Sequence, residues 1–264
     1  MNAPEAAPAG AVEPNERSKS PPARRFGSSP QSAESDRAHG WIVESRNEEA
    51  AGLVADWPGP DRPSDQRRFA VCTPIATALV LGSAQRASEG TERDAERAGI
   101  AIVRRRSGGG AVLVVPGEML WAEAWIPVGD SLWTDDVRTS ALWMGTACVR
   151  ALRSCGLDGA EVHRGPPQLP PLSRQICMAG IAPGEVLVGG RKVAGISQRR
   201  SRSGARFQVA VLLRWRPEAI TALLGRGDTV LASVRPAATG IAELLGDTSP
   251  TAQQVADALV DALP

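Results

Sequence analysis

Two short apolar runs, residues 100–103 and 111–115, flank a polar stretch of three arginines, one serine and three glycines. Apolar runs of this length, rich in isoleucine and valine, are typical of buried strands. Adjacent glycines let the backbone turn sharply and approach another molecule, because no Cβ stands in the way. The pattern predicts a strand, a basic glycine corner (residues 104–110) and a second strand.

Other segments divide by the same criteria into strands and helices. Gly189 and Gly190 predict a hairpin turn, and Thr134 is a good N-cap for a helix that reaches about Cys155. Expected strands cover 69–82, 120–126, 176–182, 185–188, 191–197 and 205–215. Expected helices cover 48–54, 92–98, 135–155, 217–224, 241–245 and a last segment from 250. Strands in the middle with flanking helices predict an α/β or α+β fold with a mixed sheet.

Residues 1–38 contain six prolines and almost no large apolar residues. Such a segment buries too little surface to offset its chain entropy, so we expect a disordered tail. Residues 39–264 are long enough to form one domain with a full core. We expect no C-terminal accessory domain after it.

Charge and composition narrow the class of protein. Thirty basic and 29 acidic residues give a net charge of +1, which does not favour bulk nucleic-acid binding. No stretch of about 18 apolar residues predicts a membrane span, and no signal peptide is recognisable, so we expect a soluble cytoplasmic protein. Four cysteines without CxxC spacing and two separate histidines indicate neither a disulfide framework nor a metal site.

Two stretches carry candidate chemistry. Successive N–H groups in a glycine corner can bind a carboxylate or phosphate, and the adjacent arginines add positive charge. The spacing fits neither a dinucleotide fingerprint nor a Walker A loop. The second stretch, GRKVAGISQRR (190–200), holds Lys192, which is the only lysine outside the expected tail. A lysine ammonium approaches one atom as a compact point charge.

Taken together, the two stretches resemble the lipoate–protein ligase and octanoyltransferase family. The first motif is matched by Arg104, Arg105, Ser107, Gly108, Gly109, Gly110, Ala111 and Val112. The second motif is matched by Gly190, Arg191, Lys192, Val193 and Gly195. The resemblance covers about residues 42–225 and implies the biotin/lipoate ligase catalytic fold, which is class II synthetase-like.

The resemblance also implies an activity. Members attach an octanoyl or lipoyl group to a lysine of lipoyl domains in 2-oxoacid dehydrogenase or glycine cleavage proteins. The donor is an acyl carrier protein or free lipoate or octanoate. The glycine corner, with Gly190 and Gly195, would contact the acyl group, and Lys192 would stabilise its carbonyl oxygen or phosphate. The acidic partner would meet four arginines, namely Arg191, Arg199, Arg200 and Arg202.

Departures from the family pattern separate two reactions. The ATP- and magnesium-dependent ligase branch has a His-Asp-x-Gly-Asn stretch, which here reads Val-Val-Pro-Gly-Glu at 114–118, and an Asn-Asp pair, which here reads Gly184-Glu185. One octanoyltransferase branch has a cysteine fifteen residues before the motif lysine, and Cys177 stands there. A cysteine nucleophile forms a thioester without ATP. His163 is a weaker candidate to assist it.

Three functions therefore stay open. The slightly favoured one is acyl transfer through a thioester on Cys177, with no cofactor. The second is an ATP-dependent lipoate ligase in which Lys192 holds an acyl-adenylate and Cys177 only packs. The third is an inactive module that binds an acyl group or its carrier. A biotin ligase is disfavoured, because the glycine corner of that branch differs.

Overall fold

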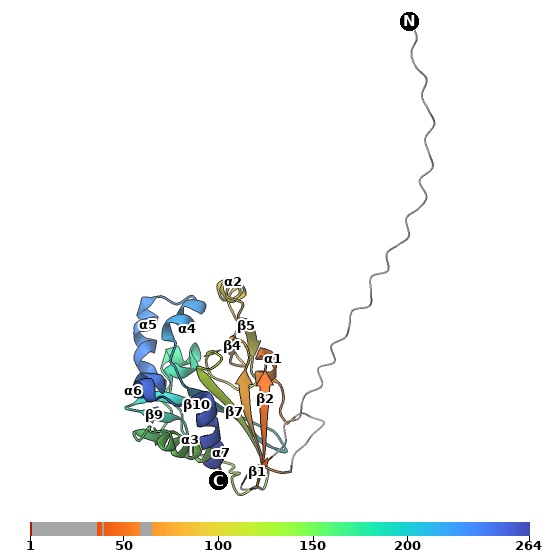
Figure 1. The fold of residues 1–264 in the computed structure, drawn as a ribbon, viewed down its shortest axis with the longest axis vertical. Coiled ribbons are helices and arrows are strands. Elements are labelled where there is room, and N and C mark those ends of the chain that lie inside the picture. The colour runs from red at the N-terminus through yellow and green to blue at the C-terminus, as the bar shows by residue number, and fades with distance from the viewer. Residues whose placement is uncertain (2–35, 39, 59–64) are drawn as a thin grey trace. The chain divides into compact units, whose positions relative to one another are not determined.

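The computed structural model describes Met1 and residues 36–38, 40–58 and 65–264. The larger sheet (Figure 1) has the spatial order β1 (Asp36–Ala38), β2 (Trp41–Glu48), β3 (Arg68–Pro74), β7 (Met119–Pro127), β11 (Gly204–Leu212), β10 (Arg191–Arg200), β9 (Val186–Val188) and β8 (Ala160–Val162). Among the strands described for this sheet, only β2 and β3 pair in parallel. The predicted mixed, mainly antiparallel sheet is confirmed.

A smaller sheet is built from β5 (Ala101–Arg104), β4 (Ala78–Leu81) and β6 (Val112–Val114). The central strand β4 is parallel to β5 and antiparallel to β6. The two predicted strands are therefore its outer strands, and the glycine corner passes the end of β4. Gly82, just after β4, makes this passage possible, because a Cβ there would lie 1.9 Å from the Gly109 carbonyl oxygen.

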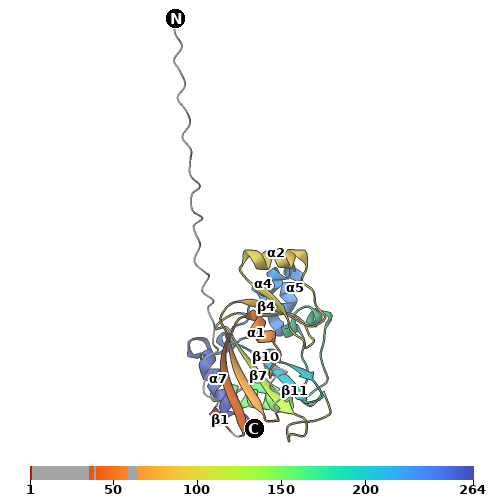
Figure 2. The ribbon, with the colours of Figure 1, turned by 90° about the vertical axis from the view of Figure 1, so that its right-hand side faces the viewer.

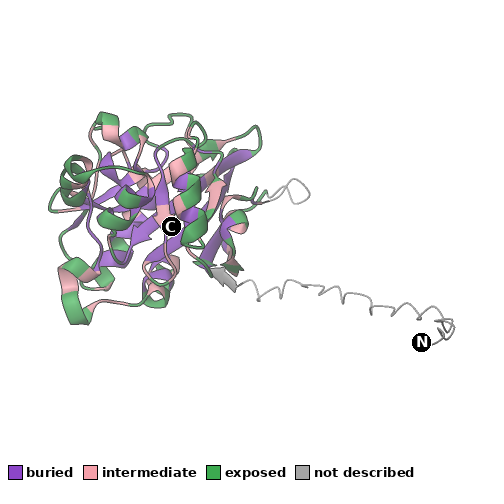
Figure 3. Ribbon diagram, turned by 90° about the horizontal axis from the view of Figure 1, so that it is seen from above, coloured by how far each residue is buried: buried purple, intermediate pink, exposed green. Residues whose placement is uncertain are grey.

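Strand β7 is buried on both faces, and its side chains alternate between two cores. Leu120, Ala122 and Ile126 pack in the core under α3 (Leu142–Ser154) and α7 (Ala252–Asp261). Trp121 and Trp125 pack on the opposite face, with residues of the smaller sheet. Figure 3 shows these buried strands in purple behind helices with exposed outer surfaces. The architecture is helices, large sheet, small sheet.

The remaining helices are short and surround the small sheet or close the C-terminal half. They are α1 (Ala50–Val54), α2 (Glu89–Arg97), α4 (Pro217–Leu223), α5 (Asp228–Val234) and α6 (Ala242–Leu245). Figure 2 shows α2, α4 and α5 gathered at one end of the domain, beyond β4. The Ser88 side chain caps α2 by accepting the Thr91 N–H. Among the described helices, none is long and apolar enough to cross a bilayer.

Three expectations differ from the structure. The helix expected from 135 begins only at Leu142, because the Asp136 side chain accepts the Arg138 N–H and the Thr139 hydroxyl and holds a turn instead. The strand expected over 176–182 is a 3-10 turn, Cys177–Ala179. The expected tail lies largely outside the described residues, but its last three residues form β1.

Candidate active site

Arg105 organises the glycine corner from inside. Its guanidinium is buried and donates to the carbonyl oxygens of Gly108 and Gly110, both at 2.8 Å, and of Val80 at 3.3 Å. Burial lowers the pKa of Arg105, an effect opposed by its charge interaction and hydrogen bond with the Cys177 side chain. The corner is thus shaped around one arginine, whereas Arg104 is exposed at the end of β5.

Cys177 lies directly against this corner. The Ala111 N–H donates to the Gln175 carbonyl oxygen, and the Cys177 N–H donates to the Ala111 carbonyl oxygen at 2.9 Å. A Cβ on Gly110 would lie 2.7 Å from the Cys177 nitrogen, so only glycine permits this approach. A Cβ on Gly109 would lie 3.8 Å from the Cys177 sulfur. Cys177 is partly exposed, as a nucleophile must be.

Lys192 joins the second motif to the same turn. Its ammonium donates to the Cys177 carbonyl oxygen at 3.0 Å and pairs with Glu185 at 2.8 Å. Glu185 also accepts the backbone N–H groups of Ala182 and Ile196. Lysine and carboxylate are both almost fully buried. The predicted residues Lys192 and Cys177 are therefore in contact, but through the backbone of the cysteine rather than its thiol.

A narrow cleft of about 20 Å³ opens beside Cys177. Strand register explains its floor, because Gly195 pairs with Ala210 and Ala210 with Trp121. The absence of a side chain at Gly195 keeps the cleft open, since a Cβ there would lie 3.4 Å from the Met178 methyl carbon. The lining residues are Arg105, Val112, Trp121, Cys177, Met178, Gly195, Ile196, Ser197, Gln208 and Ala210. Its walls are mainly apolar, which suits an acyl chain.

One end of the cleft is polar, which we did not predict. Ser107, Ser197 and Gln208 form a hydrogen-bonded group here, which we call the polar belt. Behind it, the fully buried Glu123 accepts hydrogen bonds from Gln208, Arg46 and Arg206. The sequence does carry a signal for the network, because Glu123 is the one charged residue in an otherwise apolar strand, MLWAEAWIP.

An arginine pocket lies beyond the far end of β10. Asp56 pairs with Arg106 at 2.9 Å and with Arg199 at 3.4 Å. The pocket encloses about 250 Å³ and is also lined by Trp57, Pro58, Trp125, Arg200, Ser201, Ser203 and Arg206. The four arginines predicted to meet an acidic partner do not form one patch. Arg191 begins β10 and Arg200 ends it, which places them about 30 Å apart at roughly 3.3 Å per residue.

Three other residues singled out in the sequence, Gly189, Gly190 and His163, have local roles. Gly189 and Gly190 have φ of 55° and 77° and form the turn between β9 and β10, as a two-residue hairpin requires. His163 Nε2 lies 2.9 Å from the Pro166 carbonyl oxygen. The ring therefore has a polar partner within its own loop. The backbone N–H of His163 donates to the Glu185 carbonyl oxygen.

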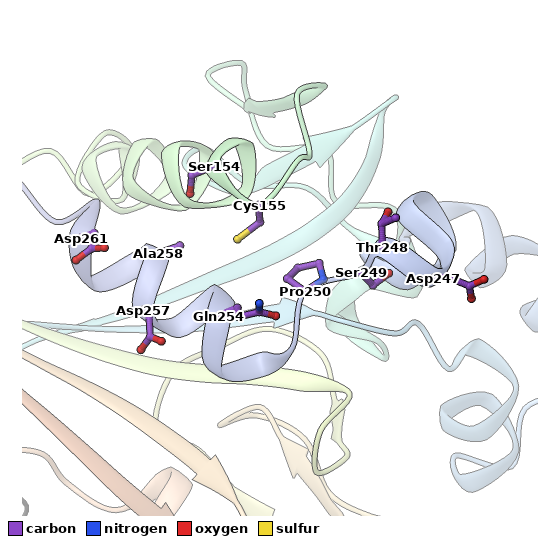
Figure 4. A pocket seen from close by; sticks show the side chains of 10 residues that line it. All are labelled: Ser154, Cys155, Asp247, Thr248, Ser249, Pro250, Gln254, Asp257, Ala258 and Asp261. Atoms are coloured by element: carbon purple, nitrogen blue, oxygen red, sulfur yellow. The ribbon is translucent and has the colours of Figure 1, made fainter.

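A larger hollow lies on the opposite side of the large sheet, between α3 and α7 (Figure 4). It encloses about 640 Å³ and is lined by three aspartates, Asp247, Asp257 and Asp261. Burial raises the pKa of Cys155 at its edge. Within the described ranges, no cluster of three or more His, Cys, Asp or Glu residues could hold a metal ion. The residues that line the hollow include Cys155 but no arginine or lysine, unlike the surroundings of Cys177.

Several solved structures have a similar fold. A lipoate–protein ligase A structure with bound ATP matches with a TM-score of 0.64 at 17% identity, covering 83% of this chain and 82% of that one. A bipartite lipoate protein ligase of Thermoplasma acidophilum, described with its E2 lipoyl domain, gives 0.62 at 18% identity, covering 83% and 80%. A biotin protein ligase of Leishmania major gives 0.50 at 13% identity, covering 84% and 72%.

These identities establish the fold alone. No curated protein matches the sequence significantly. The family model for the lipoyl protein ligase A/B catalytic domain matches residues 62–264, which include the glycine corner, Cys177 and Lys192. The chain therefore belongs to the lipoyl protein ligase A/B catalytic domain family.

Proposed function

We propose that the protein transfers an octanoyl or lipoyl group to a lysine of a lipoyl domain through a thioester on Cys177. The observation that carries the proposal is geometric: the partly exposed side chain of Cys177 and the buried guanidinium of Arg105 line the same cleft. A partly exposed thiol at the cleft can reach a substrate carbonyl, and cysteine attacks in its thiolate form. The described relative with an E2 lipoyl domain supports a lipoyl-domain acceptor.

The reaction has two halves. The Cys177 thiolate attacks the carbonyl carbon of the donor thioester, a new C–S bond forms, and the carrier thiolate leaves and takes up a proton from water. The acceptor lysine amine then attacks the Cys177 thioester, a C–N bond forms, and the cysteine leaves as thiolate. The amine proton goes to water, and no ATP is consumed. Lys192 positions the Cys177 turn by holding its carbonyl oxygen.

The second candidate function is an ATP-dependent ligase, which the ATP-bound relative favours. Such an enzyme needs a free ammonium for the negatively charged adenylate. In this chain Lys192 is already paired with Glu185 at 2.8 Å, and both groups are buried. A phosphate approaching Lys192 would meet that carboxylate at close range, and like charges repel. The residues present therefore fit an adenylate and its magnesium poorly, which supports the transferase.

The size of the cleft sets a condition on acyl binding. About 20 Å³ holds roughly one water molecule, so an eight-carbon chain enters only when a lining side chain moves. Met178 is suited to this movement, because it is unbranched and has three rotatable bonds. It lines the cleft together with Gly195, and a Cβ built on Gly195 would lie 3.4 Å from its methyl carbon. We expect Met178→Ile, which is stiffer at χ1, to raise the KM for the acyl donor more than it lowers kcat.

The proposal is tested by the intact mass of an apo lipoyl domain after incubation with the full-length protein. One reaction contains octanoyl-carrier thioester without ATP, and the other contains lipoate, ATP and magnesium. We expect an octanoyl adduct in the first, lost in Cys177→Ser and retained in the matched variant Cys155→Ser. An adduct that requires ATP and survives Cys177→Ser would establish the ligase. No adduct in either reaction would favour the inactive binding module.

We further propose that the arginine pocket contacts the acidic acceptor domain. Arg106 and Arg199 keep 59% and 46% of their side-chain surface exposed although both pair with Asp56, so their charge reaches the surface. We expect Arg199→Glu to raise the KM for the acceptor several-fold at low salt and less at high salt, because exposed charges are screened. Arg93→Glu on α2, also exposed, is the control and keeps the wild-type KM. Equal KM values in both variants would contradict this assignment.

A further inference from the structure

The polar belt has a fixed direction of hydrogen bonding. Gln208 donates both of its amide hydrogens, one to the Leu53 carbonyl oxygen at 3.1 Å and one to Glu123 at 2.9 Å. Its amide oxygen therefore accepts from the Ser107 hydroxyl at 3.4 Å. Glu123 enforces this orientation, because an ionised carboxylate can only accept hydrogen bonds. The buried charge of Glu123 is balanced by Arg46 and Arg206.

With the hydrogen bonds of the polar belt in this direction, Ser197 faces the cleft as a hydrogen-bond acceptor. A serine hydroxyl has one hydrogen and two lone pairs, and the Ser107 hydrogen is used on Gln208. The 3.1 Å bond between the two serine oxygens is then donated by Ser197. Both hydroxyl hydrogens of the belt are thereby consumed within it. Ser197, which lines the cleft and is only half-buried, presents lone pairs and no spare hydrogen to whatever occupies the cleft.

The position of Ser197 relates it to a point on the acyl chain. Gly195 and Ser197 lie on the same side of β10, two residues apart, which is about 6.6 Å at roughly 3.3 Å per residue. Three bonds of an extended chain span about 3.3–3.6 Å. A chain whose carbonyl lies near Cys177 and Gly195 therefore reaches Ser197 after about five or six bonds.

We propose that the cleft prefers an acyl group with a hydrogen-bond donor on about its sixth carbon, counted with the carbonyl carbon as the first, and that Ser197 of the polar belt recognises this donor. The proposal rests on the acyl-transfer function and specifies its substrate class. A hydroxyl or thiol hydrogen at that position meets the unused lone pairs of Ser197. A plain methylene chain leaves them without a partner, and a carbonyl at that position places acceptor against acceptor. One such hydrogen bond gives about 3- to 10-fold in affinity.

Calorimetric titration of the full-length protein with three free acids tests the ranking. We expect 6-hydroxyoctanoate to bind about 3- to 10-fold more tightly than octanoate, and 6-oxooctanoate to bind more weakly than the hydroxy acid. Octanoate binding as tightly as 6-hydroxyoctanoate would overturn the proposal. Equal affinities for the oxo and hydroxy acids would also overturn it, because the preference would then not depend on a donated hydrogen.

Variants locate the preference within the cleft. Ser197→Ala is expected to bring the affinity ratio of 6-hydroxyoctanoate to octanoate close to one, and Ser197→Thr, which keeps a hydroxyl, is expected to retain the ratio. Ser233→Ala, at an exposed position on α5, is the control and keeps it. A ratio that survives Ser197→Ala would assign the preference elsewhere and refute the proposal.

The binding and transfer measurements separate this inference from the proposed function. The titrations contain neither acceptor nor carrier and do not require Cys177 to react. Transfer of octanoyl to a lipoyl domain without the affinity ranking would overturn the substrate preference alone. The ranking without transfer in any reaction would overturn the proposed function and leave the preference of the cleft established.

Discussion

The buried pair of Lys192 and Glu185 gives a prediction that can be worked out from its contacts. Lys192→Met keeps most of the side-chain volume but removes the ammonium, so Glu185 stays buried with only its two backbone donors. Breaking a buried pair on one side costs about 3–5 kcal/mol, because the remaining charge is uncompensated. The lost hydrogen bond to the Cys177 carbonyl oxygen adds about 1 kcal/mol. We expect Lys192→Met to lower the free energy of unfolding by about 4–6 kcal/mol.

The double variant separates charge from packing. In Lys192→Met with Glu185→Gln neither residue is charged, and the glutamine oxygen still accepts a backbone N–H. We expect the double variant to lose about 1–3 kcal/mol, less than Lys192→Met alone, because no charge stays buried. Urea unfolding followed by circular dichroism measures all four proteins of the cycle. Stability losses of the two single variants that simply add up in the double variant would refute the assignment of a coupled pair.

Three further predictions follow from the site and its surroundings. Iodoacetamide at pH 8, read by peptide mass, should label the partly exposed Cys177 well before the buried Cys72, because burial raises the pKa of Cys72 to about 12. Equal labelling rates would contradict the difference in exposure between the two thiols. Gly110→Ala should lower transfer at least about 10-fold, because its Cβ would meet backbone atoms at 2.6 Å, whereas Gly108→Ala, with open space around it, should keep near wild-type activity. A hydrogen bond from arginine lowers the pKa of Glu118 below its ordinary 4.5, so the stability advantage over Glu118→Gln should be present above pH 4.5 and lost as the pH falls through the lowered pKa; an advantage that persists to pH 2 in thermal melts would show another origin.

The sequence motifs predicted the family and the mixed sheet. Of the predicted site residues, Arg105, Cys177 and Gly195 line the cleft. The motifs are informative because glycine is required where two backbone segments approach closely, as at Gly110. The fold then brings the two motif stretches to the same turn, where Lys192 binds the Cys177 carbonyl oxygen. Sequence reasoning did not find the polar belt, because its members come from segments about 90 residues apart and serine and glutamine are ordinary on a strand. The predicted start of α3 was wrong. Asp136 was expected in the first turn of the helix, but its side chain accepts the Arg138 N–H and forms a turn before the helix begins.

The placement of Arg191 shows the same limit in another form. Arg191 and Arg199 are close in the sequence, which suggested that they share one basic surface. They lie at opposite ends of β10, and an extended strand has a larger rise per residue than a helix. Arg199 instead meets Arg106 of the glycine corner through Asp56. Those three residues are far apart in the chain, and only the folded layers reveal that they share one pocket.

The double burial of β7 has a consequence for which of its positions tolerate substitution. Its even-numbered residues belong to the helix-packed core, and its odd-numbered residues belong to the side that carries the cleft. Substitutions at residues 121, 123 and 125 therefore change the side of the sheet that carries the cleft, and they leave the side chains of the helix-packed core in place. A saturation library of this strand should show tolerance that alternates with a period of two, with fitness at odd positions depending on the acyl group supplied.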